Sequence, residues 1–460
     1  MTLSAQSALS LTADLRSGRL RAEELMGASL AVIAARNPEL NAIVALREQD
    51  DLLAEARAAD QVPVDERGPL HGLPMAVKDL ANARGLVSSQ GSPIFAGQVA
   101  AQDDVFVARL RAAGAILIGK TNTPEFGLGS HTYNPVYGAT RNAVDPSRSA
   151  GGSSGGAAVA LAAGMVALAD GSDMMGSLRN PAGWNEVYGL RPTWGWVPSE
   201  PAGDVFLHPL STNGPMARSP EDIALLLDVI SGGEARLPLH RGAQPVSPLT
   251  EARPMRLGWL GDWGGAYPME EGVLETCEAA LAAFEALGHR VDRLPPPFPA
   301  EKIWQSWITL RSFAVAAGLR PLADRRDQLK DAALWELDRG LNFTGAQVQA
   351  ASDLRSAWMR AAARMFASYD AVLLPTAQCW PFPVEWDYPR EIAGRQMDTY
   401  HRWMEVVVPA SLLGLPALAV PTARGTNGLP MGLQIIGPHG TDATLLSLGQ
   451  SYHRARMGQA

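Results

Sequence analysis

Two serine-containing turns are the part of this chain best suited to nucleophilic chemistry. The segment from Gly151 to Pro192 begins with GGSSGG, continues into the small-residue stretch AAVALAAG, and later reaches the turn MMGSLRNP. The first turn is too rich in glycine for regular structure, whereas the stretch after it is a strong helix former. Two serine turns joined by a helix indicate a catalytic site that uses two serines.

The elements predicted around these turns would place their serines at a site. The N-terminus of the helix faces the first turn, where free backbone N–H groups attract developing negative charge. After the helix, MVALADGSD predicts a short buried strand that ends in a turn. Ser177 stands just beyond this strand, and Gly176 before it permits close approach of the backbone. This position indicates a serine that serves a site and does not pack in a core.

A serine hydroxyl is a weak nucleophile at neutral pH, so the site needs a group that removes its proton. Lys78 ends the apolar run PMAVK, where desolvation would lower its pKa and let the neutral amine act as a general base. Strand alternation sends Lys78 and Asp79 to opposite faces, so Asp79 need not neutralise the lysine. Taken alone, the pattern also fits an ordinary solvated lysine at the end of a strand.

Together these residues resemble the amidase signature family. The strand LPMAVKD, the loop GGSSGG and the turn DMMGSLRNPA are similar to its three markers and stand in the family's order, and ASLLGLPALAVP with GLPMGLQIIG adds to the likeness. The resemblance implies a single-domain α/β fold whose mixed central β-sheet is covered on both faces by helices, which agrees with the alternation of apolar strands and helices. It implies one amidase domain over 1–460, with a signature core at about 65–220 and a more variable substrate side at about 240–400.

The resemblance also implies roles for individual residues. It makes Ser177 the nucleophile, Ser153 the serine that relays the proton and Lys78 the base. It implies a cis peptide bond between Gly152 and Ser153, and it gives Ser154 a supporting role in the hydrogen bonds of the loop. The implied reaction is hydrolysis of a carboxylic amide C–N bond through an acyl-enzyme, with no metal and no organic cofactor.

One departure from the family pattern concerns the oxyanion hole. By resemblance, this hole consists of the backbone N–H groups of Met174, Met175, Gly176 and Ser177. The family has two glycines before the nucleophile, whereas Met175 occupies the first of these positions here. Methionine adopts positive φ less freely than glycine, so we expect a turn that accommodates a side chain. Met175 would then narrow the acyl side of the pocket, and plain packing is an equally good interpretation.

The substrate pocket is predicted mainly from family position. Gly127, Leu128 and Gly129 should face the substrate, and Tyr133 is a candidate wall. Twelve tryptophans and fifteen methionines favour an apolar or aryl substrate. We therefore expect an amidase that acts on a small-molecule amide, with esters and carbamates (urethanes) as further candidates.

Three alternative functions follow from the same residues. A glutaminase-type subunit of a tRNA amidotransferase belongs to the same family, although Met175 argues against it. The stretch from Gly151 to Gly155 also fits the GxSxG pattern of α/β-hydrolase esterases, but the turn-like NAVDPSRSA before it is not the strand that such a nucleophile needs. A catalytically inactive binding protein on this fold is opposed by the intact lysine and serines. An esterase triad would also require a histidine, and the late histidines lie in no sequence context typical of a triad: His401, His439 and His453.

Composition excludes several other classes. The 460 residues are 47% hydrophobic and can bury a large core, and a net charge of −8 leaves no basic surface for nucleic acid. No run reaches the roughly 18–20 apolar residues of a membrane span, and the first residues do not form a signal-peptide pattern. Cys277 and Cys379 have no metal or redox spacing and fit a reducing cytoplasm. We expect a cytoplasmic enzyme that binds neither nucleic acid nor membrane, and by resemblance alone a homodimer.

Overall fold

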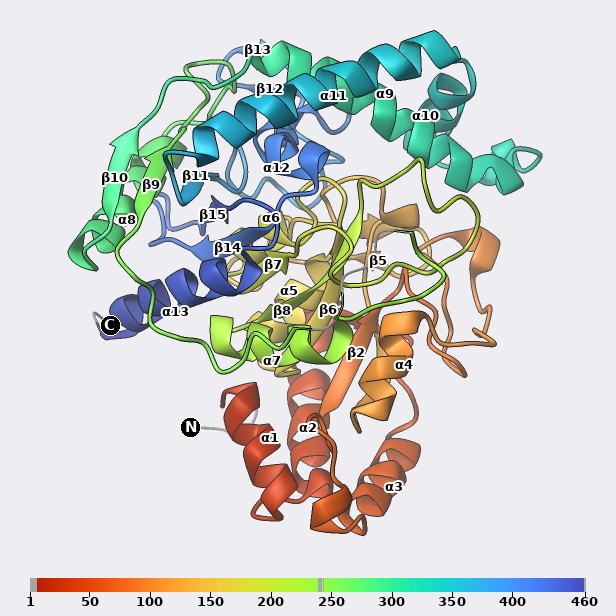
Figure 1. Ribbon diagram of the computed structural model, residues 1–460. Helices are drawn as coiled ribbons and strands as arrows, with labels where there is room; N and C mark the ends of the chain where they lie inside the picture. The colour runs from red at the N-terminus through yellow and green to blue at the C-terminus, as the bar shows by residue number, and fades with distance from the viewer. Residues whose placement is uncertain (1–5, 239–241, 243, 459–460) are drawn as a thin grey trace.

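A mixed eight-stranded sheet forms the centre of the protein (Figure 1). The computed structural model describes residues 6–238, 242 and 244–458. The strand order is β10-β9-β11-β15-β14-β7-β8-β6; β9 pairs in parallel with both neighbours, and the other pairs are antiparallel. The strands are Leu168–Asp173 (β6), Tyr188–Arg191 (β7), Thr212–Ala217 (β8), Arg256–Trp259 (β9), Arg290–Arg293 (β10), Ala371–Pro375 (β11), Ala417–Pro421 (β14) and Gly432–Ile436 (β15).

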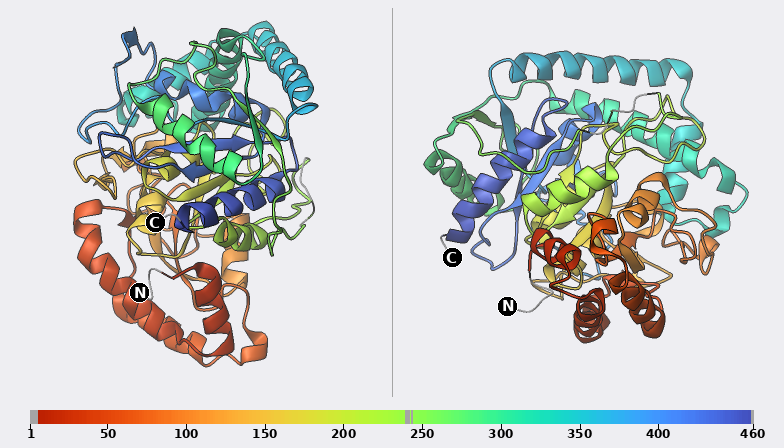
Figure 2. Two further views of the ribbon diagram at one scale, coloured as in Figure 1. Left: turned by 90° about the vertical axis from the view of Figure 1, so that its left-hand side faces the viewer. Right: turned by 60° about the horizontal axis from the view of Figure 1, so that its bottom comes forward.

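The central strands β11, β14 and β15 are buried along their whole length because helices cover both faces of the sheet. Two helices that follow the serine turns, Gly155–Ala162 (α5) and Arg179–Trp184 (α6), pack on one face. Three helices pack together on the other face and can be followed in Figure 2: Pro220–Ile230 (α7), Val273–Ala286 (α8) and Asp442–Gly458 (α13). The predicted α/β fold with a covered mixed sheet is confirmed.

A smaller sheet of order β1-β3-β2 supplies the lysine strand. Its strand β2 runs from Pro74 to Lys78, is buried throughout, and lies against β6 of the large sheet. Helices at the bottom of Figure 1 flank this region. The elements here are Ala8–Ser17 (α1), Ala22–Leu40 (α2), Ile43–Val44 (β1), Gln49–Asp60 (α3), Val105–Ala112 (α4) and Ile116–Thr121 (β3).

A helical layer covers the opposite end of the molecule, at the top of Figure 1. Here α9 packs against both α10 and α11, and α12 packs beneath them. These helices are Ala300–Leu319 (α9), Asp331–Leu341 (α10), Gly345–Phe366 (α11) and Val408–Leu413 (α12); two short hairpins complete the chain, formed by Tyr133–Asn134 (β4) with Gly138–Ala139 (β5) and Glu391–Ile392 (β12) with Arg395–Gln396 (β13).

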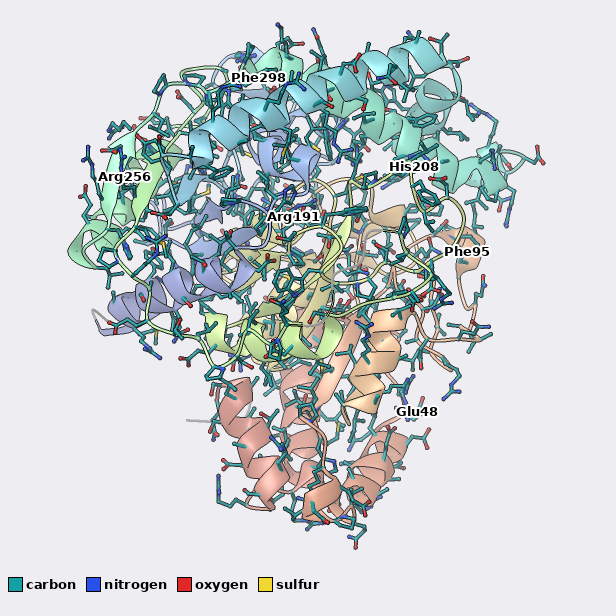
Figure 3. All side chains as sticks on the ribbon, viewed as in Figure 1. Glu48, Phe95, Arg191, His208, Arg256 and Phe298 are labelled. Atoms are coloured by element: carbon teal, nitrogen blue, oxygen red, sulfur yellow. The ribbon has the colours of Figure 1, made fainter. Side chains whose placement is uncertain are left out.

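The interior of this fold includes charged side chains as well as apolar ones. Figure 3 places Arg191 in the middle of the molecule and Arg256 at its margin, and Arg191 is fully buried. Cys277 and Cys379 are buried free thiols. Across the described residues, every helix is too short or too polar to pass through a lipid bilayer.

Candidate active site

Lys78 is buried at the end of β2 and meets both serine segments. Its side chain is held in the interior because the apolar strand that carries it lies between β3 and β6. The Lys78 Nζ atom lies 2.8 Å from Ser153 Oγ, 2.9 Å from Ser154 Oγ and 3.1 Å from Ser172 Oγ. The solvated-lysine interpretation is therefore wrong: residue 78 is only 1% exposed.

Burial changes the protonation of this lysine. Desolvation lowers the pKa of Lys78 to about 7, and it outweighs the carboxylates of Asp170 and Asp173, which act in the opposite direction. The Asp170 carboxyl accepts the backbone N–H of Lys78 at 3.1 Å, and burial raises its own pKa to about 6. A substantial fraction of the amine is consequently neutral near pH 7, and a neutral amine can accept a proton.

The first serine loop is shaped by close packing around glycines. The peptide bond between Gly152 and Ser153 is cis. A Cβ atom on Gly151, whose φ is +74°, would lie 2.4 Å from Asn180 Oδ1, and one on Gly152 would lie 2.9 Å from Thr132 Oγ1. Only glycine therefore fits these two positions, which explains the GGSS sequence. Helix α5 begins directly after the loop.

The two serine turns are in direct contact. The backbone N–H of Ser154 donates to the carbonyl oxygen of Ser177 at 3.3 Å. Ser153 and Ser177 both line one cavity of about 310 Å³. Strand β6 ends at Asp173, so it delivers Ser177 to this cavity as the sequence predicted. The structure thus brings together the lysine and both serines that the motifs singled out.

The turn from Met174 to Ser177 differs from the expected arrangement at one position. The N–H of Gly176 donates to Asp173 Oδ1 at 2.9 Å, so it is already paired within the protein. In the part of the chain that the structure describes, the N–H groups of Met174, Met175 and Ser177 donate to no acceptor. Gly176 has a φ of +81°, and a Cβ there would lie 2.9 Å from Val407 Cγ2. The position before it has no such positive φ, so Met175 fits the turn without strain.

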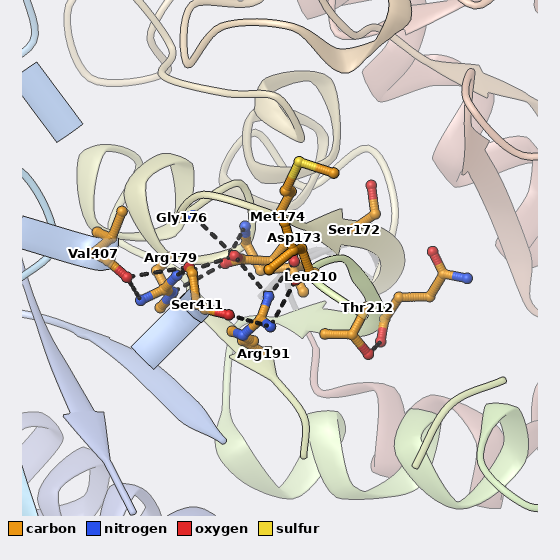
Figure 4. Close-up of polar contacts among 12 residues, drawn as sticks. Ser172, Asp173, Met174, Gly176, Arg179, Arg191, Leu210, Thr212, Val407 and Ser411 are labelled. Atoms are coloured by element: carbon orange, nitrogen blue, oxygen red, sulfur yellow. Dashed lines mark hydrogen bonds and ion pairs between the residues drawn. The ribbon is translucent and has the colours of Figure 1, made fainter. Parts of the chain in front are cut away.

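A buried ionic network holds this turn from below (Figure 4). The Asp173 carboxylate lies 3.0 Å from Arg179 Nε and 3.3 Å from Arg191 Nη1, and all three side chains are fully buried. The two guanidinium groups hold the pKa of Asp173 well below its usual range, although burial acts against them. Arg179 also donates to Val407 O at 3.0 Å and to Ser411 Oγ at 2.7 Å. Arg179 therefore fixes the turn from Met174 to Ser177 to the start of α12.

Sequence reasoning missed these supporting residues. Arg179 stands in the recognised motif DMMGSLRNPA, so its position was a usable signal, but its acceptors other than Asp173 lie more than 200 residues away in the chain. Asp170 and Ser172 lie on β6, which was predicted as a strand without a role for its polar side chains. Arg311 lines the cavity from α9, where no motif marked it.

The predicted pocket residues divide between two cavities. Gly127, Leu128 and Gly129 line the cavity that contains Ser153, and a Cβ atom on Gly127 would lie 3.7 Å from Ser153 Oγ. Leu128 and Gly129 also line a neighbouring cavity of about 590 Å³. Tyr133 lies only in this second cavity, where its hydroxyl donates to Asp387 Oδ1 at 3.2 Å. Met175 lines the first cavity and is only 4% exposed, so its side chain both borders the pocket and packs in the interior.

The esterase alternative finds no support in this geometry. Ser153 Oγ has Lys78 as its basic neighbour, and the described residues just before the loop form no strand. His453 is paired with the Tyr188 hydroxyl at 2.9 Å, and His439 lies 2.9 Å from Leu413 O. His401 lines the cavity, but neither of its ring nitrogens has a hydrogen-bond partner among the described residues.

Comparisons with known proteins agree on one family. The family model described as Amidase matches residues 24–446. An acylamidase from Rhodococcus erythropolis is 33% identical over 98% of this chain and 95% of its own length, and a glutamyl-tRNA(Gln) amidotransferase subunit from Ralstonia nicotianae is 32% identical over 98% of both chains. The crystal structure of a bacterial aryl acylamidase superposes with a TM-score of 0.91 at 26% identity, covering 98% of this chain and 96% of the other.

Proposed function

Because the chain belongs to the amidase signature family and is an amide-hydrolysing enzyme, we propose that it cleaves small-molecule amides through a triad of Ser177, Ser153 and Lys78. The observation that carries this proposal is the contact of 2.8 Å between Lys78 Nζ and Ser153 Oγ in a buried setting that lowers the pKa of the lysine to about 7. A base of this pKa is matched to neutral pH.

The hydrogen bonds around Lys78 favour Ser153 as the proton relay. A neutral amine has two N–H donors and one lone pair, and three hydroxyl oxygens surround Nζ. The Ser154 hydroxyl is directed to the Ser172 carbonyl oxygen at 3.4 Å, so its oxygen is left to accept from the amine. With Ser154 and Ser172 as acceptors, the lone pair faces Ser153, whose proton it can take.

The proposed reaction proceeds by acyl transfer. Ser177 Oγ attacks the amide carbonyl while its proton passes to Ser153, and the proton of Ser153 passes to Lys78. The N–H groups of Met174, Met175 and Ser177 are available to stabilise the oxyanion, whereas that of Gly176 holds the turn to Asp173. The relay then reverses: Ser153 protonates the leaving nitrogen, because an amide anion is a very poor leaving group. Water hydrolyses the acyl-enzyme by the same steps.

The lining of the first cavity supports an apolar or aryl substrate. Most of its large side chains are apolar, namely Leu80, Phe126, Leu128, Met174, Met175, Val315 and Leu319. The names of two relatives, an acylamidase and an aryl acylamidase, agree with this class. Esters and carbamates pass through similar tetrahedral states, so we propose them as secondary substrates.

A glutaminase subunit remains the second candidate, because a tRNA amidotransferase subunit is 32% identical over the same length. Met175 favours the free-standing amidase, since it fills space beside the reacting serine that a second glycine would leave open. Hydrolysis of apolar anilides by the isolated chain, with no release of ammonia from glutamine, would favour the first candidate.

Covalent labelling tests the proposal directly. The purified protein is treated with a fluorophosphonate, digested and examined by mass spectrometry, and we expect the adduct on Ser177. Ser177→Ala should abolish both labelling and turnover, whereas the matched variant Ser154→Ala should keep part of each, because in the proposed relay Ser154 supports Lys78 by hydrogen bonding and passes on no proton. An adduct on Ser153 or Ser154, and never on Ser177, would contradict the assignment.

A further inference from the structure

Two large polar side chains, Arg311 and His401, line the cavity that contains Ser153 and Ser177. They are only 4% and 2% exposed. Both lie against Tyr400: an Arg311 nitrogen donates to its hydroxyl at 2.7 Å, and the His401 ring centroid is 4.5 Å from the tyrosine ring. We call Arg311 and His401 the polar corner of the cavity.

The guanidinium of Arg311 has one edge without an oxygen partner. Its Nε donates to Glu336 Oε1 at 2.8 Å, and one terminal nitrogen donates to Tyr400. The other terminal nitrogen meets only the Met174 sulfur, at 3.2 Å. A thioether is a weak acceptor, and a guanidinium carries five N–H groups. This edge is therefore able to donate to a group that enters the cavity.

His401 is an unpartnered polar side chain in the same place. Neither ring nitrogen has a hydrogen-bond partner within residues 6–238, 242 and 244–458. The ring packs among Trp304, Trp335 and Tyr400. Burial, together with the positive charges of Arg311, Arg339 and Arg402, keeps the pKa of His401 well below its ordinary value, so the ring is neutral and offers one donor and one acceptor. Buried polar groups are rarely left unsatisfied in proteins, and the His401 side chain lines the cavity.

The charge balance of the corner selects the kind of group that it can bind. Glu336 forms an ion pair with Arg311 and also accepts the Ser312 hydroxyl at 2.6 Å. The ion pair and the neutral ring of His401 together carry no net charge. Two more arginines act on His401: Arg402 is paired with Glu405, and Arg339 is only partly buried. A substrate carboxylate would lose its hydration and gain only the partly screened charge of Arg339, which is costly in a buried site. An uncharged oxygen acceptor avoids this cost and still receives a charge-assisted hydrogen bond.

We propose that the polar corner binds an uncharged hydrogen-bond acceptor of the substrate, such as a second carbonyl or an ether oxygen. This inference rests on the proposed amidase function and narrows its substrate class to apolar amides that carry such an oxygen at one position. Arg311 would donate from its free edge, and His401 would donate from one ring nitrogen. The remaining apolar walls would hold the carbon chain.

Two matched sets of amides test this inference. In one set an ether oxygen replaces successive methylene groups of the acyl chain, and in the other set it replaces those of the amine chain. Each ether is compared with its all-carbon parent by kcat/KM. We expect at least one ether position to be preferred by about tenfold, which corresponds to about 1.4 kcal/mol, because it gains a hydrogen bond to a charged donor. A terminal carboxylate should be disfavoured.

Variants assign the preference to the corner. His401→Phe removes both ring nitrogens without breaking any hydrogen bond to the described protein, and it should bring the ether-to-parent ratio towards one. The double variant Arg311→Met with Glu336→Gln removes the donor and its counter-charge together, so no buried charge is left alone, and it should have the same effect. Trp307→Phe is the control, since this residue is buried on the same helix and does not line the cavity. It should preserve the ratio.

Three results would overturn the inference: no preferred ether position in the wild type, a preference that survives in both corner variants, or a preference for the carboxylate. Failure of the amidase function itself looks different, because then no amide of either set is cleaved and Ser177 is not labelled. The two outcomes are therefore distinguishable in one experiment.

Discussion

The protonation of a single amine decides when the proposed triad can work. Burial lowers the pKa of Lys78 to about 7, and the reaction needs its neutral form. The neutral fraction increases as the pH rises through this value, so kcat/KM for an amide should rise with pH on the acid side and level off above about 8. Without burial, the same lysine would remain protonated until about pH 10.4.

Replacing this lysine gives the corresponding test. Lys78→Ala should lower kcat/KM for an amide by several orders of magnitude, and it should affect an ester of the same acyl group less, since only the amide requires protonation of its leaving group. A pH profile from pH 5 to 9, recorded for both proteins on both substrates, measures this. Near-wild-type amide hydrolysis, or an acid limb that survives the substitution, would disprove the role of Lys78.

At the scale of residues, local motifs identified side chains that the structure brings together, and their catalytic roles stay a prediction. Ser153 and Lys78 each stand in a recognisable segment, and the contact between them follows from the family order of those segments. The polar corner could not be predicted, because Arg311 and His401 are 90 positions apart in the chain and come together only in the folded protein, where both contact Tyr400. Their side chains look like ordinary surface residues of helical segments in the sequence.

At the scale of elements, the turn between β6 and α6 combines an unusual residue with a rigid support. Met175 lines the cavity, so Met175→Gly should enlarge the space beside Ser177 and shift preference towards bulkier acyl groups. The hydrolysis itself should continue, since Asp173 still holds the turn through Gly176 and Leu178. Relative kcat/KM values across a graded series of acyl p-nitroanilides measure the shift; an unchanged series would show that this side chain serves packing alone.

The ionic support of the same turn should be essential for stability. Asp173→Asn leaves Arg179 and Arg191 buried without their counter-charge, which we expect to lower the free energy of unfolding by about 3–5 kcal/mol. Urea unfolding followed by circular dichroism measures this change. Asp338→Asn is a suitable comparison, because its pair with Arg326 is about half exposed and should contribute far less to the free energy of unfolding. Equal effects of the two substitutions would contradict the network's role.

The elements predicted from sequence were those with strong local patterns. The small-residue helix is α5, the strand before Ser177 is β6, and Lys78 ends β2, as the apolar runs indicated. The layer of α9, α10 and α11 lies in the more variable substrate side at about 240–400, where no motif indicates how its helices are arranged. Their arrangement depends on packing between helices, and the amphipathic patterns alone do not determine which helices meet.

At the scale of the whole molecule, the reactivity of the two buried cysteines reports whether the protein is folded. Cys277 and Cys379 are 0% and 3% exposed, and burial raises the pKa of both thiols. In the native protein both should react with a water-soluble disulfide reagent far more slowly than in urea, where two thiols per chain should appear. Stopped-flow absorbance with this reagent follows the reaction. Rapid modification of either thiol without urea would show that its surroundings open readily.

The large sequence separation between Arg179 and three of its hydrogen-bond acceptors has a consequence for biosynthesis. Its acceptors on Val407, Ser411 and Gln434 are encoded 228 to 255 residues after it, so a ribosome must complete most of the chain before they exist. Until then the turn that carries Ser177 lacks these contacts to Arg179, although the serine and the lysine have already been translated. We therefore expect hydrolytic competence to arise only near the end of translation.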